Sequence, residues 1–174
     1  YTVKYASTTV VDTTTYFYGS ARASSSTINV AMTASQVERT NAAGTDINIV
    51  ASVGADSNTK SITYYTNGVG DEQADYTVKY AGLAPVDYTF YFYGTTVANS
   101  VRAGSGSINK AMYASIVQKT STTIAAVAAN TNTKSITYYK NGTGDEQADY
   151  TVKYAGTTVV DTTTYFYGSA RASS

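Results

Sequence analysis

The chain has 174 residues, of which 43% are hydrophobic and only 14% are charged, and its twelve acidic side chains balance twelve basic ones. A neutral chain whose lysines and arginines stand singly lacks the clustered positive charge of nucleic-acid-binding proteins, so we expect no nucleic-acid partner. Because histidine and cysteine are both absent, no Ser-His or Cys-His pair and no ordinary zinc site can form, and we expect no enzyme.

The sequence also argues against a membrane span and for a β-rich fold. No segment approaches the roughly 18 consecutive apolar residues of a membrane-spanning helix. The chain opens on a strand-like segment at Tyr1, without an initiator methionine or a signal peptide, and we expect a processed or excerpted piece. Eighteen tyrosines and many threonines favour strands, since aromatic and β-branched side chains pack well on pleated sheets.

Internal repetition is the dominant feature. The recurring segments are YTVKYA at 1–6, 76–81 and 150–155, YFYG at 16–19, 91–94 and 165–168, TKSITYY at 59–65 and 133–139, and GDEQAD at 70–75 and 144–149. The chain therefore divides into a first repeat at 1–75, a second at 76–149 and the first strand pair of a third at 150–174. The third copy matches residues 1–25 except for Gly156 in place of Ser7, which indicates a piece of a longer array.

Each repeat begins with two predicted strands. In YTVKYA the side chains alternate with a period of two, as expected of a half-buried strand, and the segment ending in YFYG supplies the second strand. We expect the two to form a hairpin or an arch. They could also complete a sheet that the preceding repeat begins.

The middle of each repeat is less clearly patterned. Residues 27–37 fit a strand by alternation and a short helix by spacing, and we favour the strand. The apolar stretches 47–53 and 123–129 and the following KSITYY segments are plausible strands. Asn67-Gly68 and Asn141-Gly142 predict tight turns, because this pair favours positive φ angles, and GDEQAD then forms a wide hairpin or a linker.

About five strands in roughly 75 residues predict an all-β fold of tandem small β-sandwich repeats of immunoglobulin-like kind. A stack of β-arches, or solenoid, is the alternative.

The GDEQAD segments are candidate calcium sites. Carboxylate oxygens are the ligands that calcium prefers, and a bound ion at a loop between two β-repeats would stiffen the joint. The candidate ligands are Asp71, Glu72, Asp75, Asp145, Glu146 and Asp149. A solvated acidic turn needs no metal, however, and no other cofactor is predicted.

The tyrosine pairs are candidate assembly contacts. Adjacent aromatic residues place rings on both faces of a strand, and only one face can be core; the groups are Tyr16-Phe17-Tyr18, Tyr91-Phe92-Tyr93 and Tyr64-Tyr65. We expect the other face to pack against further strands or subunits, with carbohydrate stacking as the alternative. The candidates are Tyr16, Tyr18, Tyr64, Tyr65, Tyr91, Tyr93, Tyr138 and Tyr139. Asn141-Gly142-Thr143 also fits the glycosylation sequon, which makes Asn141 a candidate glycosylation site.

Near-identical repeats, low charge, absence of cysteine and richness in threonine and tyrosine resemble the tandem β-repeats of microbial surface proteins. These include immunoglobulin-like arrays, fibrous adhesins, S-layer proteins and sheath proteins. The resemblance implies an extracellular structural protein that builds a filament, sheath or surface layer through β-strand contacts with copies of itself or with adjoining repeats. The alternative is the calcium-stiffened stalk of a cell-surface adhesin.

Overall fold

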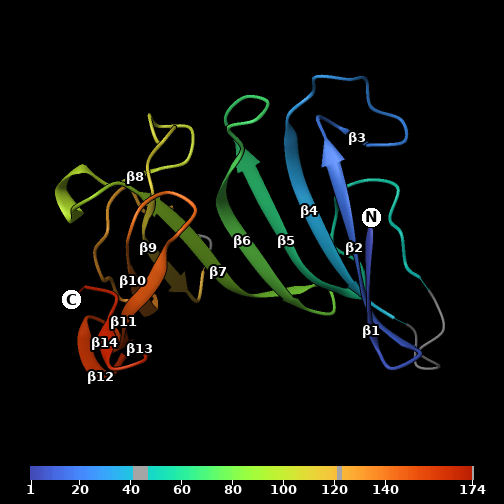
Figure 1. Ribbon diagram of the computed structural model, residues 1–174. Helices are drawn as coiled ribbons and strands as arrows, with labels where there is room; N and C mark the ends of the chain where they lie inside the picture. Colours follow the sequence, from blue (N-terminus) through green and yellow to red (C-terminus); the bar gives the residue numbers. More distant parts are fainter. Residues whose placement is uncertain (41–46, 121–122, 174) are drawn as a thin grey trace. The chain divides into compact units, whose positions relative to one another are not determined.

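The computed structural model describes residues 1–40, 47–120 and 123–173. The predicted all-β class is confirmed: the strands pair antiparallel, and the one helical element of the described residues is the short 3-10 helix η1 (Val97–Asn99). The chain forms two compact units, residues 1–86 and 87–174 (Figure 1).

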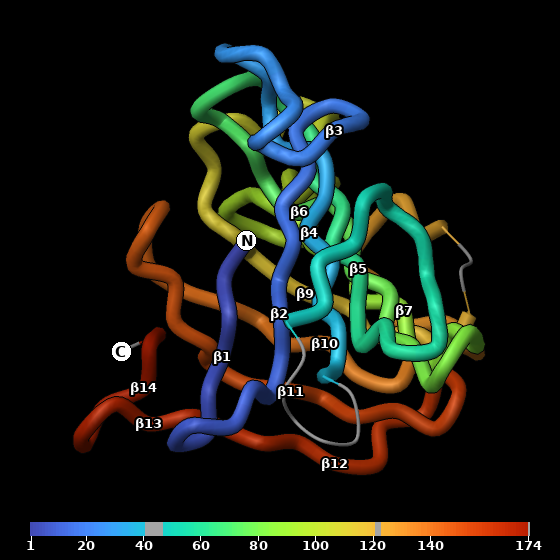
Figure 2. Tube along the Cα trace, turned by 90° about the vertical axis from the view of Figure 1, so that its right-hand side faces the viewer, coloured from blue at the N-terminus to red at the C-terminus, as the bar shows by residue number. Residues whose placement is uncertain are grey.

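The first unit is an antiparallel meander. Its strands are β1 (Thr2–Ala6), β2 (Thr9–Tyr18), β3 (Ala21–Arg22), β4 (Met32–Arg39), β5 (Thr59–Thr66) and β6 (Gln73–Ala81). The sheet order is β1-β2-β4-β5-β6, and the short β3 pairs with the end of β2. Figure 1 shows β2, β4, β5 and β6 side by side, and Figure 2 traces β1 alongside β2.

The second unit repeats this plan. Its strands are β7 (Ala84–Tyr93, whose first residues belong to the first unit), β8 (Val101–Arg102), β9 (Met112–Gln118), β10 (Thr133–Lys140), β11 (Gln147–Ala155), β12 (Thr158–Thr164), β13 (Phe166–Tyr167) and β14 (Ala170–Arg171). The sheet order is β7-β9-β10-β11-β12, with β8 paired to β7 and β13 paired to β14.

Alternation along the strands decides which residues form each core. In β2, Thr13, Thr15 and Phe17 are buried while the residues between them are half-buried. The core of the first unit also contains Ala34, Ile62 and Val78, and that of the second contains Phe90, Phe92, Ala114, Ile116 and Ile136. Burial of these apolar side chains supplies the main stabilisation of each sheet.

Two strand predictions are wrong. Residues 47–53 and 123–129 are irregular loops, so each full repeat has four main strands rather than about five. Ile124 and Val127 are nevertheless buried, and the amide N–H of Asn48 donates to the Thr13 hydroxyl oxygen. An apolar loop packed over a sheet gives the same short apolar run as a buried strand, which is why the pattern misleads.

The ambiguous segment at 27–37 becomes a strand only from Met32 onward. Asn29 and Asn109 take positive φ angles of 62° and 59° before β4 and β9, which places a turn where the strand was expected to start. The Asn-Gly turn prediction is correct only in part: Asn67 and Asn141 have positive φ angles of 79° and 76°, but Gly68 and Gly142 do not, and the hydrogen-bonded turns run over residues 68–71 and 142–145.

The borders of the compact units differ from those of the sequence repeats. β6 carries the YTVKYA segment that opens the second repeat, yet it pairs with β5 of the first repeat. β11 does the same with β10. YTVKYA thus completes a sheet that the preceding repeat begins. An immunoglobulin-like sandwich is not confirmed, since every main strand within a unit pairs with its neighbours along the chain.

Candidate functional site

The junction between consecutive repeats has the same contacts at both places where the described residues contain it. At the first junction Thr63 pairs with Thr77 and Tyr64 pairs with Tyr76 across β5 and β6. The two threonine hydroxyls hydrogen-bond at 2.8 Å, and the two tyrosine rings stack with centroids 4.6 Å apart. Stacked cross-strand aromatic pairs and threonine pairs both stabilise a sheet, so this junction is a specific contact.

The second junction has the same register and the same contacts. Thr137 and Thr151 hydroxyls lie 2.8 Å apart, and the rings of Tyr138 and Tyr150 stack at 4.7 Å. The ring of Tyr113 packs edge-on against Tyr138. Burial, followed by the neighbouring tyrosines, raises the pKa of Tyr138 to about 12. Two independent copies of one contact indicate that the repeat sequence encodes this junction.

A glutamate from the GDEQAD loop fastens each junction to the start of a strand. Glu72 accepts hydrogen bonds from the backbone N–H groups of Met32, at 3.2 Å, and Gly70, at 2.9 Å. Hydrogen bonds from backbone N–H groups lower the pKa of this carboxyl, because they favour its charged form. Glu146 makes the same two contacts with Met112 and Gly144 at 3.1 and 2.9 Å. The glutamates therefore act as clamps between the loop and β4 or β9.

The other acidic residues of these loops do not converge on one point. Asp149 is buried and accepts hydrogen bonds from Arg171, at 2.9 and 3.1 Å, and from Ser173. Although burial raises the pKa of Asp149, Arg171 and Ser173 outweigh it and the pKa is lowered. Within the described residues, no three acidic side chains gather as a metal site would require. Calcium binding at Asp71, Asp75, Asp145 and their neighbours stays a prediction.

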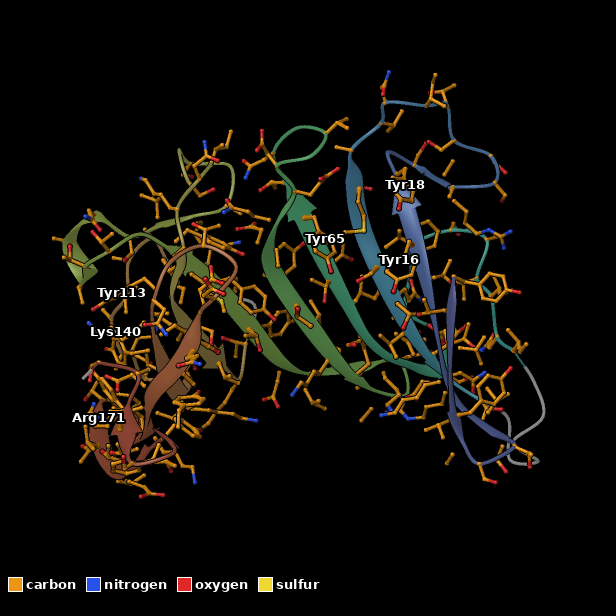
Figure 3. All side chains as sticks on the ribbon, viewed as in Figure 1. Tyr16, Tyr18, Tyr65, Tyr113, Lys140 and Arg171 are labelled. Carbon is orange, nitrogen blue, oxygen red and sulfur yellow. The ribbon has the colours of Figure 1, made fainter. Side chains whose placement is uncertain are left out.

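Most of the tyrosines expected at assembly contacts have partners inside their own unit. The hydroxyl of Tyr65 hydrogen-bonds with Ser35, that of Tyr139 with Ser115, and that of Tyr16 with Thr2. Tyr93 is buried, and Tyr18 and Tyr91 are half-buried. Figure 3 shows Tyr16 and Tyr18 on β2 and Tyr65 on β5. Their part in assembly stays a prediction.

The hollow beside Tyr16 is small for a sugar or another ligand. It is lined by Tyr1, Thr15, Tyr16, Arg22, Ala23, Ser24 and Ile49, and its volume is about 130 Å³. Ligand pockets usually measure roughly 300 to 1,000 Å³. Asn141 lies on an exposed turn, where its side-chain amide donates to Gln147 at 3.2 Å, and its glycosylation stays a prediction.

Comparison of the chain with family models, with curated proteins and with solved structures found no match. Function must therefore be inferred from the repeats themselves. In the described ranges no helix has the length and apolar character needed to cross a bilayer.

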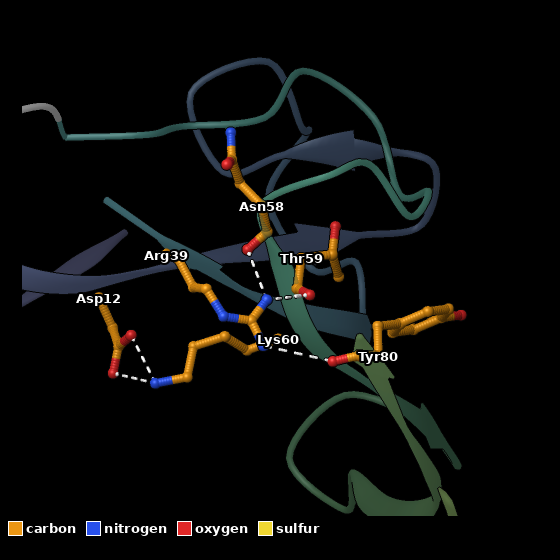
Figure 4. Close-up of polar contacts among 6 residues, drawn as sticks. All are labelled: Asp12, Arg39, Asn58, Thr59, Lys60 and Tyr80. Atoms are coloured by element: carbon orange, nitrogen blue, oxygen red, sulfur yellow. Dashed lines mark hydrogen bonds and ion pairs between the residues drawn. The ribbon is translucent and has the colours of Figure 1, made fainter. Parts of the chain in front are cut away.

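The Arg39 side chain, which sequence reasoning missed, holds one end of the first junction. The Arg39 guanidinium, on β4, donates to the backbone carbonyls of Thr59, at 2.7 Å, and Tyr80, at 3.3 Å (Figure 4). It thereby links three consecutive strands. Beside it, Lys60 pairs with Asp12 at 2.7 Å. In the second unit Lys134 pairs with Asp87 in the same way. The repeated Asp and Lys positions are the sequence signal for this pair.

Sequence reasoning also missed a buried carboxyl in the first unit. Glu38 is fully buried and accepts hydrogen bonds from Gln36, at 2.6 Å, and Thr59, at 2.8 Å. Burial raises its pKa, and the nearby Asp56 raises it further. The second unit has Gln118 in place of Glu38, so its fold forms without an acid at this position.

The third copy places an identical sequence in a different environment. Residues 158–164 repeat residues 9–15 without change. Val10 is 5% exposed and Val159 is 55% exposed, while Phe17 is 0% and Phe166 is 64% exposed. The difference arises because β2 has β4 as a second neighbour, whereas β12 pairs only with β11 in the described residues.

Proposed function

We propose that this chain is a structural repeat protein that builds an extracellular filament, sheath or surface layer by pairing β-strands between neighbouring units. Its role is mechanical and it has no catalytic activity. Its partners are copies of itself or adjoining repeats of a longer chain.

The observation that carries the proposal is the repeat junction. One repeat is joined to the next by the pairing of its last strand with the first strand of the following copy, in one register at both junctions. A unit built in this way exposes a strand edge wherever the next copy is absent. Such edges are templates for pairing with another chain, and pairing in trans would use the same contacts as pairing in cis.

The charge and side-chain composition supports the same role. A chain with few charges and no net charge has little long-range repulsion between copies. Val159, Val160, Phe166 and Tyr167 on β12 and β13 are exposed where the equivalent strand β2 of the first copy is covered by β4, so either an adjoining repeat or another copy can supply the covering strand.

Light scattering of the purified chain over a concentration series, combined with electron microscopy, tests this function. The proposal predicts ordered filaments or sheets that grow with concentration and survive a calcium chelator. Separate particles of constant length at all concentrations, which lose rigidity when the chelator is added, would instead favour a calcium-stiffened adhesin stalk and overturn the proposal.

A further inference from the structure

Four half-buried tyrosines form two stacked pairs that have the same geometry at the two repeat junctions. Tyr64 stacks on Tyr76 with ring centroids 4.6 Å apart and ring planes at 22° to each other. Tyr138 stacks on Tyr150 at 4.7 Å and 23°. In each pair the two residues are directly opposite in the sheet, so two phenol rings connect the last strand of one repeat with the first strand of the next copy.

The paired phenols are uncharged at neutral pH, and the second junction adds a third ring. Burial raises the pKa of Tyr64 and of Tyr150, as it does that of Tyr138, so no repulsion between phenolates separates these rings. Tyr113, on β9, packs edge-on against Tyr138 with centroids 5.9 Å apart. The first unit has Thr33 at the position of Tyr113, so the first pair shows what two rings do without a third.

Two phenol rings in contact are substrates for oxidative coupling. A one-electron oxidant removes one electron and one proton from each phenol, and the two phenoxyl radicals form a carbon–carbon bond between their ortho carbons. The two ortho hydrogens then move to the oxygens, which restores both phenols. With hydrogen peroxide as oxidant and a haem peroxidase to take single electrons, two tyrosines and one peroxide give one biphenol and two waters.

We propose that both stacked pairs are sites of oxidative cross-linking, at which a peroxidase and peroxide join consecutive repeats covalently through their tyrosine rings. The bond forms within one chain, so it does not depend on the proposed function. The torsion about the Cβ–Cγ bond of tyrosine is broad, so a ring can turn in place until the ortho carbons meet. The chain has no cysteine, and a covalent bond between paired strands here would resist their separation under force as a disulfide would.

The neighbouring tyrosines provide matched controls, because their hydroxyl groups contact serine. The hydroxyl of Tyr65 hydrogen-bonds with that of Ser35 at 3.2 Å, and the hydroxyl of Tyr139 with that of Ser115 at 3.3 Å. Tyr139 directly follows Tyr138 in the sequence, so the two differ in ring contact rather than in location along the chain.

Oxidation of the dilute chain, below the concentration at which scattering appears, tests the second site. The band of single-chain mass is isolated and digested with trypsin. Because trypsin cleaves after Lys140, Tyr138 leaves in peptide 135–140 and Tyr150 in peptide 141–153. Peroxide with peroxidase should leave these two peptides joined, with two hydrogens lost, and should produce the fluorescence of a biphenol.

The first site is read from one tryptic peptide, residues 61–79, which contains both of its tyrosines. Oxidation should remove two hydrogens from this peptide. Further cleavage before its aspartates should then leave fragments 61–70 and 75–79 joined, whereas they separate in the untreated chain.

Substitution by phenylalanine keeps the ring and removes the phenol. Tyr150→Phe should abolish the joined peptides of the second site and leave the first site unchanged. Tyr139→Phe should form the joined peptides as the wild type does. Loss of the product in Tyr139→Phe would mean that coupling uses Tyr139, and the stacked pair would not be the site.

Two further outcomes would overturn the proposal. Peptide 135–140 joined to peptide 111–119, which carries Tyr113, in place of 141–153 would show that coupling stays within one repeat. Absence of joined peptides under conditions that couple free N-acetyltyrosine would show that the stacked rings do not react. Because single chains are measured, a failure of the wild type to assemble would contradict the proposed function and leave the cross-link standing.

Discussion

Phe17 and Phe166 occupy equivalent positions of two repeats but differ in burial, so their substitution tests how each repeat packs. Phe17 is fully buried, so Phe17→Ala should lower the free energy of unfolding of the first unit by about 3 to 5 kcal/mol. Phe166 has the same neighbours in sequence but is 64% exposed. Phe166→Ala should change the stability of the single chain by less than about 0.5 kcal/mol. A loss of 3 to 5 kcal/mol is a large part of the roughly 5 to 15 kcal/mol that stabilises a domain.

The assay is native-state hydrogen exchange by mass spectrometry on dilute protein, below the concentration at which scattering appears. Peptides from β4 and β9 differ in sequence, so they report the two units separately. Phe17→Ala should speed exchange in β4 and leave β9 unchanged. If Phe166→Ala destabilised the dilute chain as strongly as Phe17→Ala does, Phe166 would be packed within its own chain, and the exposure of its side chain given above would be wrong.

Three further substitutions test the polar contacts. Burial raises the pKa of Glu38, so the folded state loses stability as pH rises above the ordinary carboxyl value of 4.5. Glu38→Gln should therefore have its unfolding midpoint at a higher urea concentration than the wild type at neutral pH. A midpoint at a lower urea concentration would contradict this. Glu72→Ala should speed hydrogen exchange of the Met32 backbone amide, and an unchanged rate at neutral pH would show that Glu72 does not hold this strand. The pKa of the Glu72 carboxyl is lowered in the folded chain, so its stabilising contribution in the wild type should be lost as pH falls through that pKa. Arg39→Lys should lower the free energy of unfolding, measured by urea titration, by about 1 kcal/mol. No loss would show that the hydrogen bonds of Arg39 to the carbonyls of Thr59 and Tyr80 do not stabilise the fold.

The sequence carried enough information for the class of fold and for several of its turns. Alternation in YTVKYA correctly predicts strands, because the side-chain period acts within a few residues. The Asn-Gly pairs correctly predict positive φ angles at Asn67 and Asn141 but not the position of the turn. The loops at 47–53 and 123–129 were misread since burial alone does not distinguish a covering loop from a strand.

The contacts of the candidate sites could not be predicted from the sequence, because they depend on pairing between segments that lie far apart in it. The sequence identifies Glu72 as an acidic loop residue, but its backbone partner Met32 lies 40 positions away in the sequence. The Arg39 contact with the carbonyl of Tyr80 joins different repeats and leaves no local pattern. What the sequence did reveal is the repeat itself, from which the equivalence of β1, β6 and β11 follows.

Sedimentation velocity of the wild-type chain across a wide concentration range shows whether the chain assembles through strand pairing. Assembly through strand pairing predicts a single chain at low concentration and a growing series of larger species as concentration rises, unchanged by a calcium chelator. A sedimentation coefficient that stays at the value of one chain up to the solubility limit would contradict the account.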